Sequence, residues 1–205
     1  CHLPIQLSHY LGAHPDVPPG IAYKDGLPEP SEYGVGEEDW VARNQDFFAK
    51  ESGYGFLQLS KPQTLAAGLN DSPAGQLAWI IEKRRTWADT HGDIESIWDK
   101  DHLCATTTVY WATQTGGSSA RFYKEALLKP WQPSFIRFPM VEAPTALGVY
   151  PADVLLMPKR WSERYYNLQQ YRVHPRGGHF APYECPDLFV DDVRTFFRKF
   201  RASGG

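Results

Sequence analysis

The chain has 205 residues, a formal net charge of −3 and 42% hydrophobic residues. This length and apolar content are enough for one sizeable core with room for an inserted subdomain. The charge balance provides no dominant basic patch, which argues against a nucleic-acid partner. No apolar run approaches the roughly 18 to 20 residues that a membrane-spanning helix needs, so we expect no membrane segment.

The first two thirds of the chain are predicted to be mainly helical. A short strand is expected at residues 1–7, followed by a loop rich in Pro and Gly up to residue 37. Apolar spacing and Pro near helix starts predict helices at residues 38–51, 61–68, 72–88, 100–114 and 119–127. The glycines at 53 and 55 are expected to end the first helix, and those at 116 and 117 to separate the last two.

The pattern changes after Pro130 to alternating strands and helices. Strands are predicted at residues 141–149 and 168–174, and helices at 158–166 and 187–201. A mainly helical block of about 90 residues therefore lies between one strand and a βαβα unit, which indicates the α/β class.

Cysteine and histidine usage gives little sign of a disulfide framework or a metal site. Cys1, Cys104 and Cys185 form no CxxC pair and are typical of reduced thiols, which favours a cytoplasmic location. The histidines other than His179 have no spacing typical of metal ligands, so we expect no metal.

One acid and one histidine follow the two late predicted strands. Asp153 follows the first strand, and His179 follows the second after Gly177 and Gly178, 26 residues later. Because parallel strands end at the same edge of a sheet, the two side chains are expected to lie side by side. An aspartate on one ring nitrogen would leave the other nitrogen free to accept a proton. Glu184 is a second candidate for the acid.

Six motifs occur in an order that resembles a known family. They are Ser52-Gly53-Tyr54, Lys61-Pro62-Gln63-Thr64, Gly68-Leu69-Asn70-Asp71-Ser72-Pro73-Ala74-Gly75, Arg121-Phe122-Tyr123-Lys124-Glu125, Tyr150-Pro151-Ala152-Asp153 and Arg176-Gly177-Gly178-His179-Phe180. Together they resemble the microsomal-type epoxide hydrolases, over nearly the whole chain. The resemblance implies the C-terminal portion of an α/β-hydrolase fold, in which a helical lid joins the last strands and helices of a parallel sheet.

The resemblance also implies a role for each of four residues. His179 corresponds to the family's water-activating base, and Asp153 to its acid partner, which is often Glu in relatives. Tyr54 and Tyr123 correspond to the lid tyrosines that hold the epoxide oxygen. The implied reaction converts a small apolar epoxide to a vicinal diol through an aspartyl ester, without a cofactor. The implied division is hydrolase core at 1–37, lid at 38–130, and a core carrying acid and base at 131–205.

The family's nucleophile, an Asp in a tight turn between small residues, has no counterpart in this chain. Asp39 and Asp71 have different settings, and the chain begins at Cys1, so we expect a fragment or a processed chain. Two alternatives remain open at this stage. The chain could be a non-catalytic half that binds a separate N-terminal piece, or part of another hydrolase of this fold, such as an esterase or haloalkane dehalogenase.

Overall fold

The computed structural model describes residues 28–128 and 139–201, and the strand predicted at residues 1–7 lies outside them. The described helices are α2 (Trp40–Glu51), α3 (Gly53–Ser60), α4 (Pro62–Asp71), α5 (Pro73–Trp87), α6 (Lys100–Ala112), α7 (Thr115–Leu128), α8 (Lys159–Tyr165), α9 (Ala181–Glu184) and α10 (Pro186–Arg198). Two short 3-10 helices, η1 (Pro30–Glu32) and η2 (Ile94–Ser96), and the strands β1 (Val141–Val149) and β2 (Tyr166–Val173) complete the described elements.

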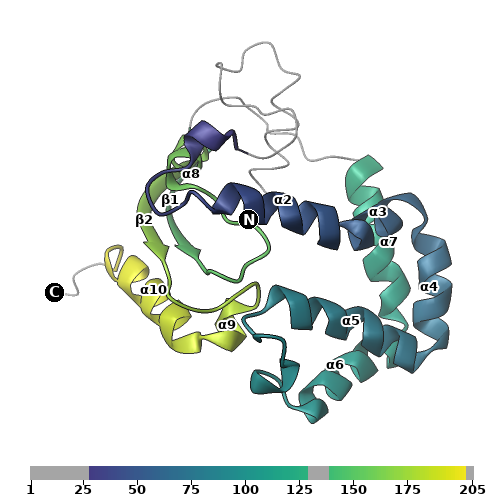
Figure 1. Ribbon diagram of the computed structural model, residues 1–205. Coiled ribbons are helices and arrows are strands. Elements are labelled where there is room, and N and C mark those ends of the chain that lie inside the picture. The colour runs from purple at the N-terminus through teal and green to yellow at the C-terminus, as the bar shows by residue number, and fades with distance from the viewer. Residues whose placement is uncertain (1–27, 129–138, 202–205) are drawn as a thin grey trace.

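The two strands are parallel neighbours joined by α8, as the sequence predicts. Their register pairs Val149 with Val173 at the carboxyl ends, and it shifts near Pro144, which has no N–H group to donate to the ladder. Figure 1 shows the strands with α8, α9 and α10 on one side of the molecule, and α3, α4 and α7 on the opposite side, at the right of the view. Helices α2 and α5 run between these two parts (Figure 1).

Helix α2 is fastened to the strand region by a buried amide. The Asn44 side chain donates to the Leu156 carbonyl at 2.9 Å and accepts from the Leu156 N–H at 2.9 Å. Beside it, Trp40 packs with Val149 and Leu156 in one buried apolar cluster. The first helix of the helical block is therefore bound to the segment that follows β1.

The predicted helices are largely confirmed, and several have shifted ends. Helix α5 begins as predicted, with Pro73 in its first turn and the Ser72 hydroxyl accepting from the Gly75 N–H. Helix α4 extends to Asp71, beyond the predicted end. The prediction that the first helix ends before Gly53 is confirmed, because α2 ends at Glu51. A second helix was not predicted there: α3 begins at Gly53 after Ser52 alone and contains both Gly53 and Gly55.

The glycines at 116 and 117 were expected to separate two helices, but the separation comes just before them, between Ala112 and Thr115. Both glycines lie within α7, which packs against α4. A Cβ atom at Gly116 would lie 2.3 Å from Gln76 Oε1, and one at Gly117 would lie 2.9 Å from the Ala66 Cβ. These glycines allow helices to approach closely, so packing outweighs their low helix propensity.

No described helix is long and apolar enough to cross a membrane. The observed architecture is a helical region joined to two parallel strands and their flanking helices, which agrees with the α/β class expected from the sequence. Where the lid ends and the core begins stays a prediction.

Candidate active site

Backbone pairing continues past the ends of both strands and brings two loops together. The His174 N–H donates to the Val149 carbonyl at 2.8 Å, and the Ala152 N–H donates to the Gly177 carbonyl at 2.9 Å. Ala152 and Gly178 form one further parallel bridge. The loops that carry Asp153 and His179 are thus held side by side.

The carboxylate of Asp153 contacts the imidazole of His179. Asp153 Oδ1 lies 2.9 Å from His179 Nδ1, and the same oxygen accepts from the Val154 N–H at 2.7 Å. The Asp153 side chain is 13% exposed and that of His179 is 29% exposed. With Nδ1–H donating to the carboxylate, Nε2 is the nitrogen that can accept a proton.

The glycines before the histidine have the conformation that the sequence suggests. Gly177 has φ of +101°, in the left-handed region that favours glycine. A Cβ atom at Gly178 would lie 2.7 Å from the Trp87 carbonyl oxygen and 2.9 Å from the Ala88 Cα. The prediction that this turn passes close to another part of the backbone is confirmed.

The two tyrosines named from the sequence lie together on neighbouring helices. Tyr54 in α3 and Tyr123 in α7 have ring centroids 6.0 Å apart in an edge-on arrangement. Burial, with a smaller contribution from Tyr123, raises the pKa of Tyr54 to about 12. Tyr54 therefore remains a protonated donor over the ordinary pH range.

Trp87 at the end of α5 joins the two pairs. Its ring centroid lies 5.5 Å from that of His179 and 5.0 Å from that of Tyr54. Its carbonyl accepts from the His179 N–H at 2.8 Å, and its indole N–H donates to Glu51 at 3.1 Å. The structure thus brings His179 and Tyr54 against a single indole, with Asp153 on His179 and Tyr123 against Tyr54.

Sequence reasoning missed Trp87, although its ring lies against both His179 and Tyr54. It lies at the end of a predicted helix and outside every recognised motif, and a tryptophan there is typical of an ordinary core residue. It is buried with Val154 and Leu155, and Phe47 and Phe180 pack against this cluster. The walls beside the His179–Asp153 pair are therefore mainly apolar.

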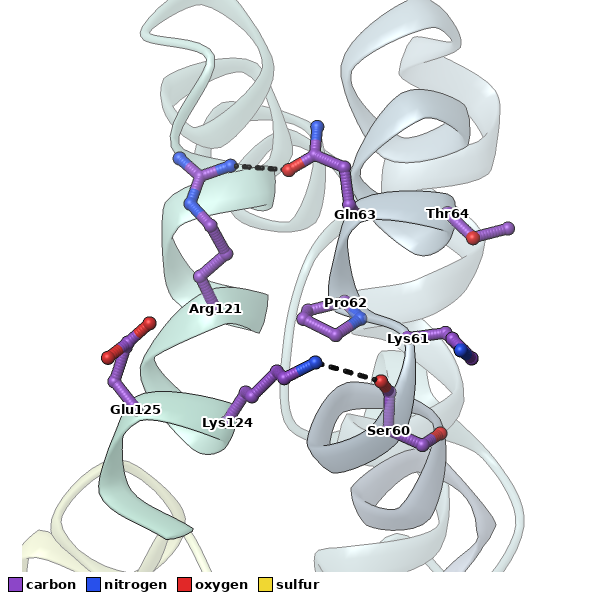
Figure 2. A pocket seen from close by; sticks show the side chains of 8 residues that line it. All are labelled: Ser60, Lys61, Pro62, Gln63, Thr64, Arg121, Lys124 and Glu125. Carbon is purple, nitrogen blue, oxygen red and sulfur yellow. Dashed lines mark hydrogen bonds between the residues drawn. The ribbon is translucent and has the colours of Figure 1, made fainter. Parts of the chain in front are cut away.

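A polar cleft of about 260 Å³ lies on the other side of α7, at the α3–α4 corner (Figure 2). Arg121 donates to Gln63 Oε1 at 3.1 Å, and Lys124 donates to the Ser60 carbonyl at 3.3 Å. None of the four predicted site residues lines this cleft. These two hydrogen bonds tie α7 to α4 and α3 on both sides of Tyr123 in the sequence.

A second cleft, of about 210 Å³, is lined in part by Tyr54 and Lys83. The Lys83 ammonium lies 4.1 Å from the ring centroid of Trp79 and 5.4 Å from that of Tyr54. Burial lowers the pKa of Lys83, and nearby Glu51 opposes that change. A cation over the Tyr54 ring helps to fix that ring in place.

Comparisons with known proteins give consistent relatives. No model of a known protein family matches the chain. A protein of Stigmatella aurantiaca (strain DW4/3-1) whose name assigns it to the epoxide hydrolases is 36% identical over 201 residues, 97% of this chain and 43% of that protein. Epoxide hydrolase 1 of Sus scrofa is 38% identical over 154 residues, covering 72% of this chain and 34% of the enzyme.

Solved structures agree with these sequence relatives. The crystal structure of juvenile hormone epoxide hydrolase from Bombyx mori matches with a TM-score of 0.71 and 30% identity, over 85% of this chain and 42% of that one. The Aspergillus niger epoxide hydrolase structure matches in fold with a TM-score of 0.70 at 24% identity, over 84% of this chain and 42% of that one. The chain spans less than half the length of these relatives. It is a homologue of the epoxide hydrolases of the microsomal and juvenile hormone type, with a partial α/β-hydrolase fold.

Proposed function

We propose that this chain supplies the base, the acid and the lid donors of an epoxide hydrolase whose nucleophile lies outside these 205 residues. One observation carries the proposal. The His179–Asp153 contact and the Tyr54–Tyr123 pair lie against the same buried indole, that of Trp87. A base with its acid and a pair of phenol donors can therefore serve a single bound substrate.

In the proposed first step, a carboxylate from outside this chain attacks one carbon of the epoxide. A carbon–oxygen ester bond forms, the oxirane carbon–oxygen bond breaks, and negative charge develops on the released oxygen. The hydroxyls of Tyr54 and Tyr123 donate to that oxygen, and one proton passes to it. Such donors act most strongly where charge develops in a site that excludes water.

In the proposed second step, water cleaves the ester. His179 Nε2 accepts a proton from water while the water oxygen bonds to the ester carbonyl carbon. The tetrahedral intermediate then collapses, the diol leaves, and the attacking carboxylate is restored. The proton on His179 returns to the tyrosinate through solvent, so the net reaction adds one water to the epoxide. Asp153 stabilises the imidazolium that forms in between.

The surroundings of the pair support an apolar substrate. The rings of Trp87 and Phe180 lie against His179, and Phe47 packs against Trp87, which gives aromatic walls on this side of the histidine. Such walls favour a small epoxide with an aryl or alkyl substituent. The steps above move protons only between side chains and water, so they require no cofactor.

The test uses this chain together with the segment that supplies the nucleophile, as one polypeptide or as two co-expressed ones. Diol formation from styrene oxide is measured by chromatography. His179→Gln is expected to lower the rate by roughly 10²- to 10⁴-fold, and Tyr54→Phe or Tyr123→Phe by about 10²-fold. Tyr110→Phe is a matched control, because Tyr110 and Tyr123 are both 38% exposed. If the unmodified protein produces no diol, or if both tyrosine variants are unaffected, the proposal fails.

A second candidate is that the chain acts only as a binding half. Among the described residues the sheet has two strands, and α10 exposes Phe189, Val193 and Phe197 at 37%, 39% and 55%. These apolar side chains would be covered by a completing half of the fold. Light scattering of the chain alone distinguishes a chain that is stable by itself from one that requires a partner. A monomer with cooperative unfolding would count against a required partner, whereas self-association relieved by the other half would support one.

A further inference from the structure

A second set of carboxylates holds the backbone of the loop that carries His179. Residues 87–89, at the end of α5, lie against residues 177–180. The Gly177 N–H donates to Asp89 Oδ2 at 2.8 Å, next to the bond from the His179 N–H to the Trp87 carbonyl at 2.8 Å. The loop is therefore attached on both sides of Gly178 to the helical block.

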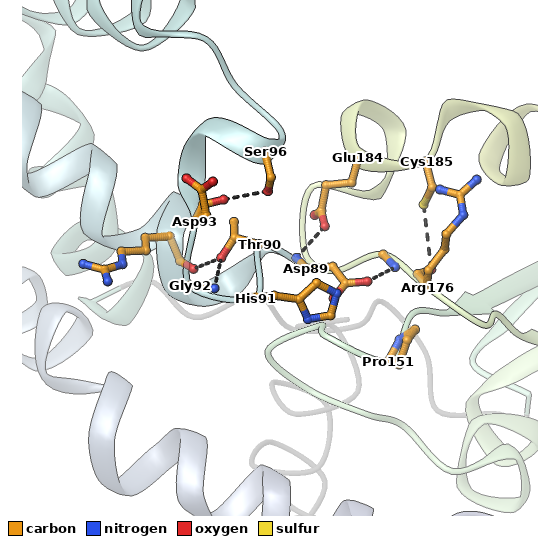
Figure 3. Close-up of polar contacts among 12 residues, drawn as sticks. Asp89, Thr90, His91, Gly92, Asp93, Ser96, Pro151, Arg176, Glu184 and Cys185 are labelled. Atoms are coloured by element: carbon orange, nitrogen blue, oxygen red, sulfur yellow. Dashed lines mark hydrogen bonds and ion pairs between the residues drawn. The ribbon is translucent and has the colours of Figure 1, made fainter.

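Glu184 closes this arrangement from the other direction. Its Oε2 accepts from the Asp89 N–H at 2.7 Å, and its Oε1 accepts from the Phe180 N–H at 2.7 Å. Figure 3 shows Glu184 reaching from α9 towards Asp89, and Asp89 reaching back towards the loop after Arg176. Both oxygens of Glu184 thus bind backbone N–H groups, so Glu184 supports the loop, whereas Asp153 contacts the imidazole.

Asp89 and Glu184 lie in surroundings that would disfavour their charged carboxylate forms if these hydrogen bonds were absent. Burial, together with the nearby charge of Asp89, raises the pKa of Glu184, whereas the backbone N–H groups that it accepts oppose this rise. The Asp89 side chain is 20% exposed, and its other oxygen lies 3.4 Å from His91. Partly buried like charges are retained here because each one accepts from the backbone of the opposite segment.

We propose that Asp89 and Glu184 are positioning residues for His179, which lock the loop of the base to the end of the lid helix α5. This inference rests on the proposed function. A shift of the loop of about 1 Å would separate Nδ1 from Asp153 and move Nε2 away from the ester, and misplacement on that scale can cost on the order of 10²-fold in rate. With the bonds of Asp89 and Glu184 in place, the loop of His179 and the end of α5 would move as one body.

The test compares Asp89→Ala, Glu184→Ala and Asp89→Asn in the protein used for the turnover assay. Ester formation is followed in a single turnover by mass spectrometry, and ester hydrolysis by diol release. The alanine variants are expected to slow hydrolysis at least tenfold and to leave ester formation within about twofold. Asp89→Asn keeps an oxygen that can face the Gly177 N–H, so it should retain most of the hydrolysis rate.

Asp187→Asn is the matched control. Its carboxylate lies three residues after Glu184 but binds the exposed Arg176 side chain, at 2.7 Å and 2.8 Å, instead of the loop backbone. This variant should hydrolyse the ester at the unmodified rate. A loss as large as that of Glu184→Ala would mean that removing charge near the loop is enough, and would overturn the proposal.

A readout that does not depend on turnover keeps the two proposals separable. The hydrogen-bonded Nδ1 proton of His179 gives a downfield proton resonance, which His179→Gln identifies by its loss. Asp89→Ala and Glu184→Ala should broaden or remove this resonance, while Asp187→Asn should leave it unchanged. An unchanged resonance in both alanine variants refutes the positioning role, even if the protein proves inactive on epoxides. An equal slowing of both steps with a lower Tm would also refute it, since that result indicates general loosening of the fold.

Discussion

Close contact of two backbones at Gly178 sets the position of the candidate base. The residue has no side chain, which lets the loop of His179 lie directly on the Trp87 carbonyl, and a Cβ atom would lie 2.7 Å from that oxygen. The obstacle is backbone, which cannot rotate away as a flexible side chain can. The position of the His179 imidazole therefore depends on Gly178, a residue with no side chain that could take part in a reaction.

Gly178→Ala is expected to destabilise the protein by about 1–3 kcal/mol, because the loop must move away from α5. Diol formation should fall with it. Gly68→Ala is the control, since a Cβ atom at Gly68 in α4 meets nothing within 4 Å and alanine favours the helix by about 1 kcal/mol. Chemical denaturation of the two variants measures both changes. If Gly178→Ala and Gly68→Ala were equally stable, the close contact of Gly178 with the Trp87 carbonyl would not constrain the loop.

Burial of phenol groups predicts a specific response to alkaline pH. Tyr54 has its pKa raised from 10.0 to about 12 in the folded protein. A raised pKa means that the folded state holds this proton more tightly than the unfolded state. The stabilisation is therefore fully present below pH 10 and is lost as the pH rises towards about 12.

Tyr54→Phe should consequently reduce the loss of stability between these two pH values. The tyrosinate absorbance of the unmodified protein should also rise late, because burial raises the pKa of a further set of tyrosines, Tyr150, Tyr166 and Tyr171. An absorbance titration and urea midpoints over this pH range measure both effects. Ionisation of every tyrosine near pH 10 would contradict the burial described for Tyr54.

Among the elements, α2 connects the helical block to the strand region through Asn44. Both polar groups of its amide bind the backbone of Leu156, and the residue is almost fully buried. Asn44→Ala is expected to cost about 1–3 kcal/mol, because it leaves a buried N–H and a buried carbonyl without partners.

Asp46→Ala on the same helix serves as the comparison for Asn44→Ala. It removes only an exposed i,i+4 pair with Lys50 and should change stability by less than about 0.5 kcal/mol. Thermal unfolding of both variants gives the two values. Similar effects would mean that the amide does not connect the two parts of the molecule.

How far the elements could be predicted depends on what determines each one. Helices that start with a capping side chain and a Pro in the first turn, such as α5, follow from local chemistry. Helix α7 was misjudged because Gly116 and Gly117 are poor helix formers alone, and only the contact with α4 and α5 favours them. That contact joins residues distant in sequence and leaves no local signal.

The same distinction applies to the site. The contact between Asp153 and His179 was predictable, because two parallel strands end at one edge and each residue follows one strand. The contacts of Trp87 with His179 and Tyr54 were not predictable, because they depend on how α5 packs. The backbone bonds of Asp89 and Glu184 were hidden for the same reason.

At the scale of the whole molecule, the proposed function divides two tasks between two parts. In that proposal the helical region would supply phenol donors for opening the epoxide, and the strand region would supply the pair that hydrolyses the ester. Trp87 touches both parts. The chain spans 43% of its Stigmatella relative, and in the proposed function the group that forms the ester is supplied from outside these 205 residues.

The division of tasks is tested most directly by trapping the ester intermediate. The protein with its nucleophile-bearing segment is mixed with styrene oxide and its intact mass is followed over time. His179→Gln should gain the mass of one epoxide and keep it, because alkylation proceeds and hydrolysis does not. The double variant Tyr54→Phe, Tyr123→Phe should gain no such mass. A His179→Gln protein that releases diol at the unmodified rate, or a double variant that is alkylated as fast as the unmodified protein, would contradict the account.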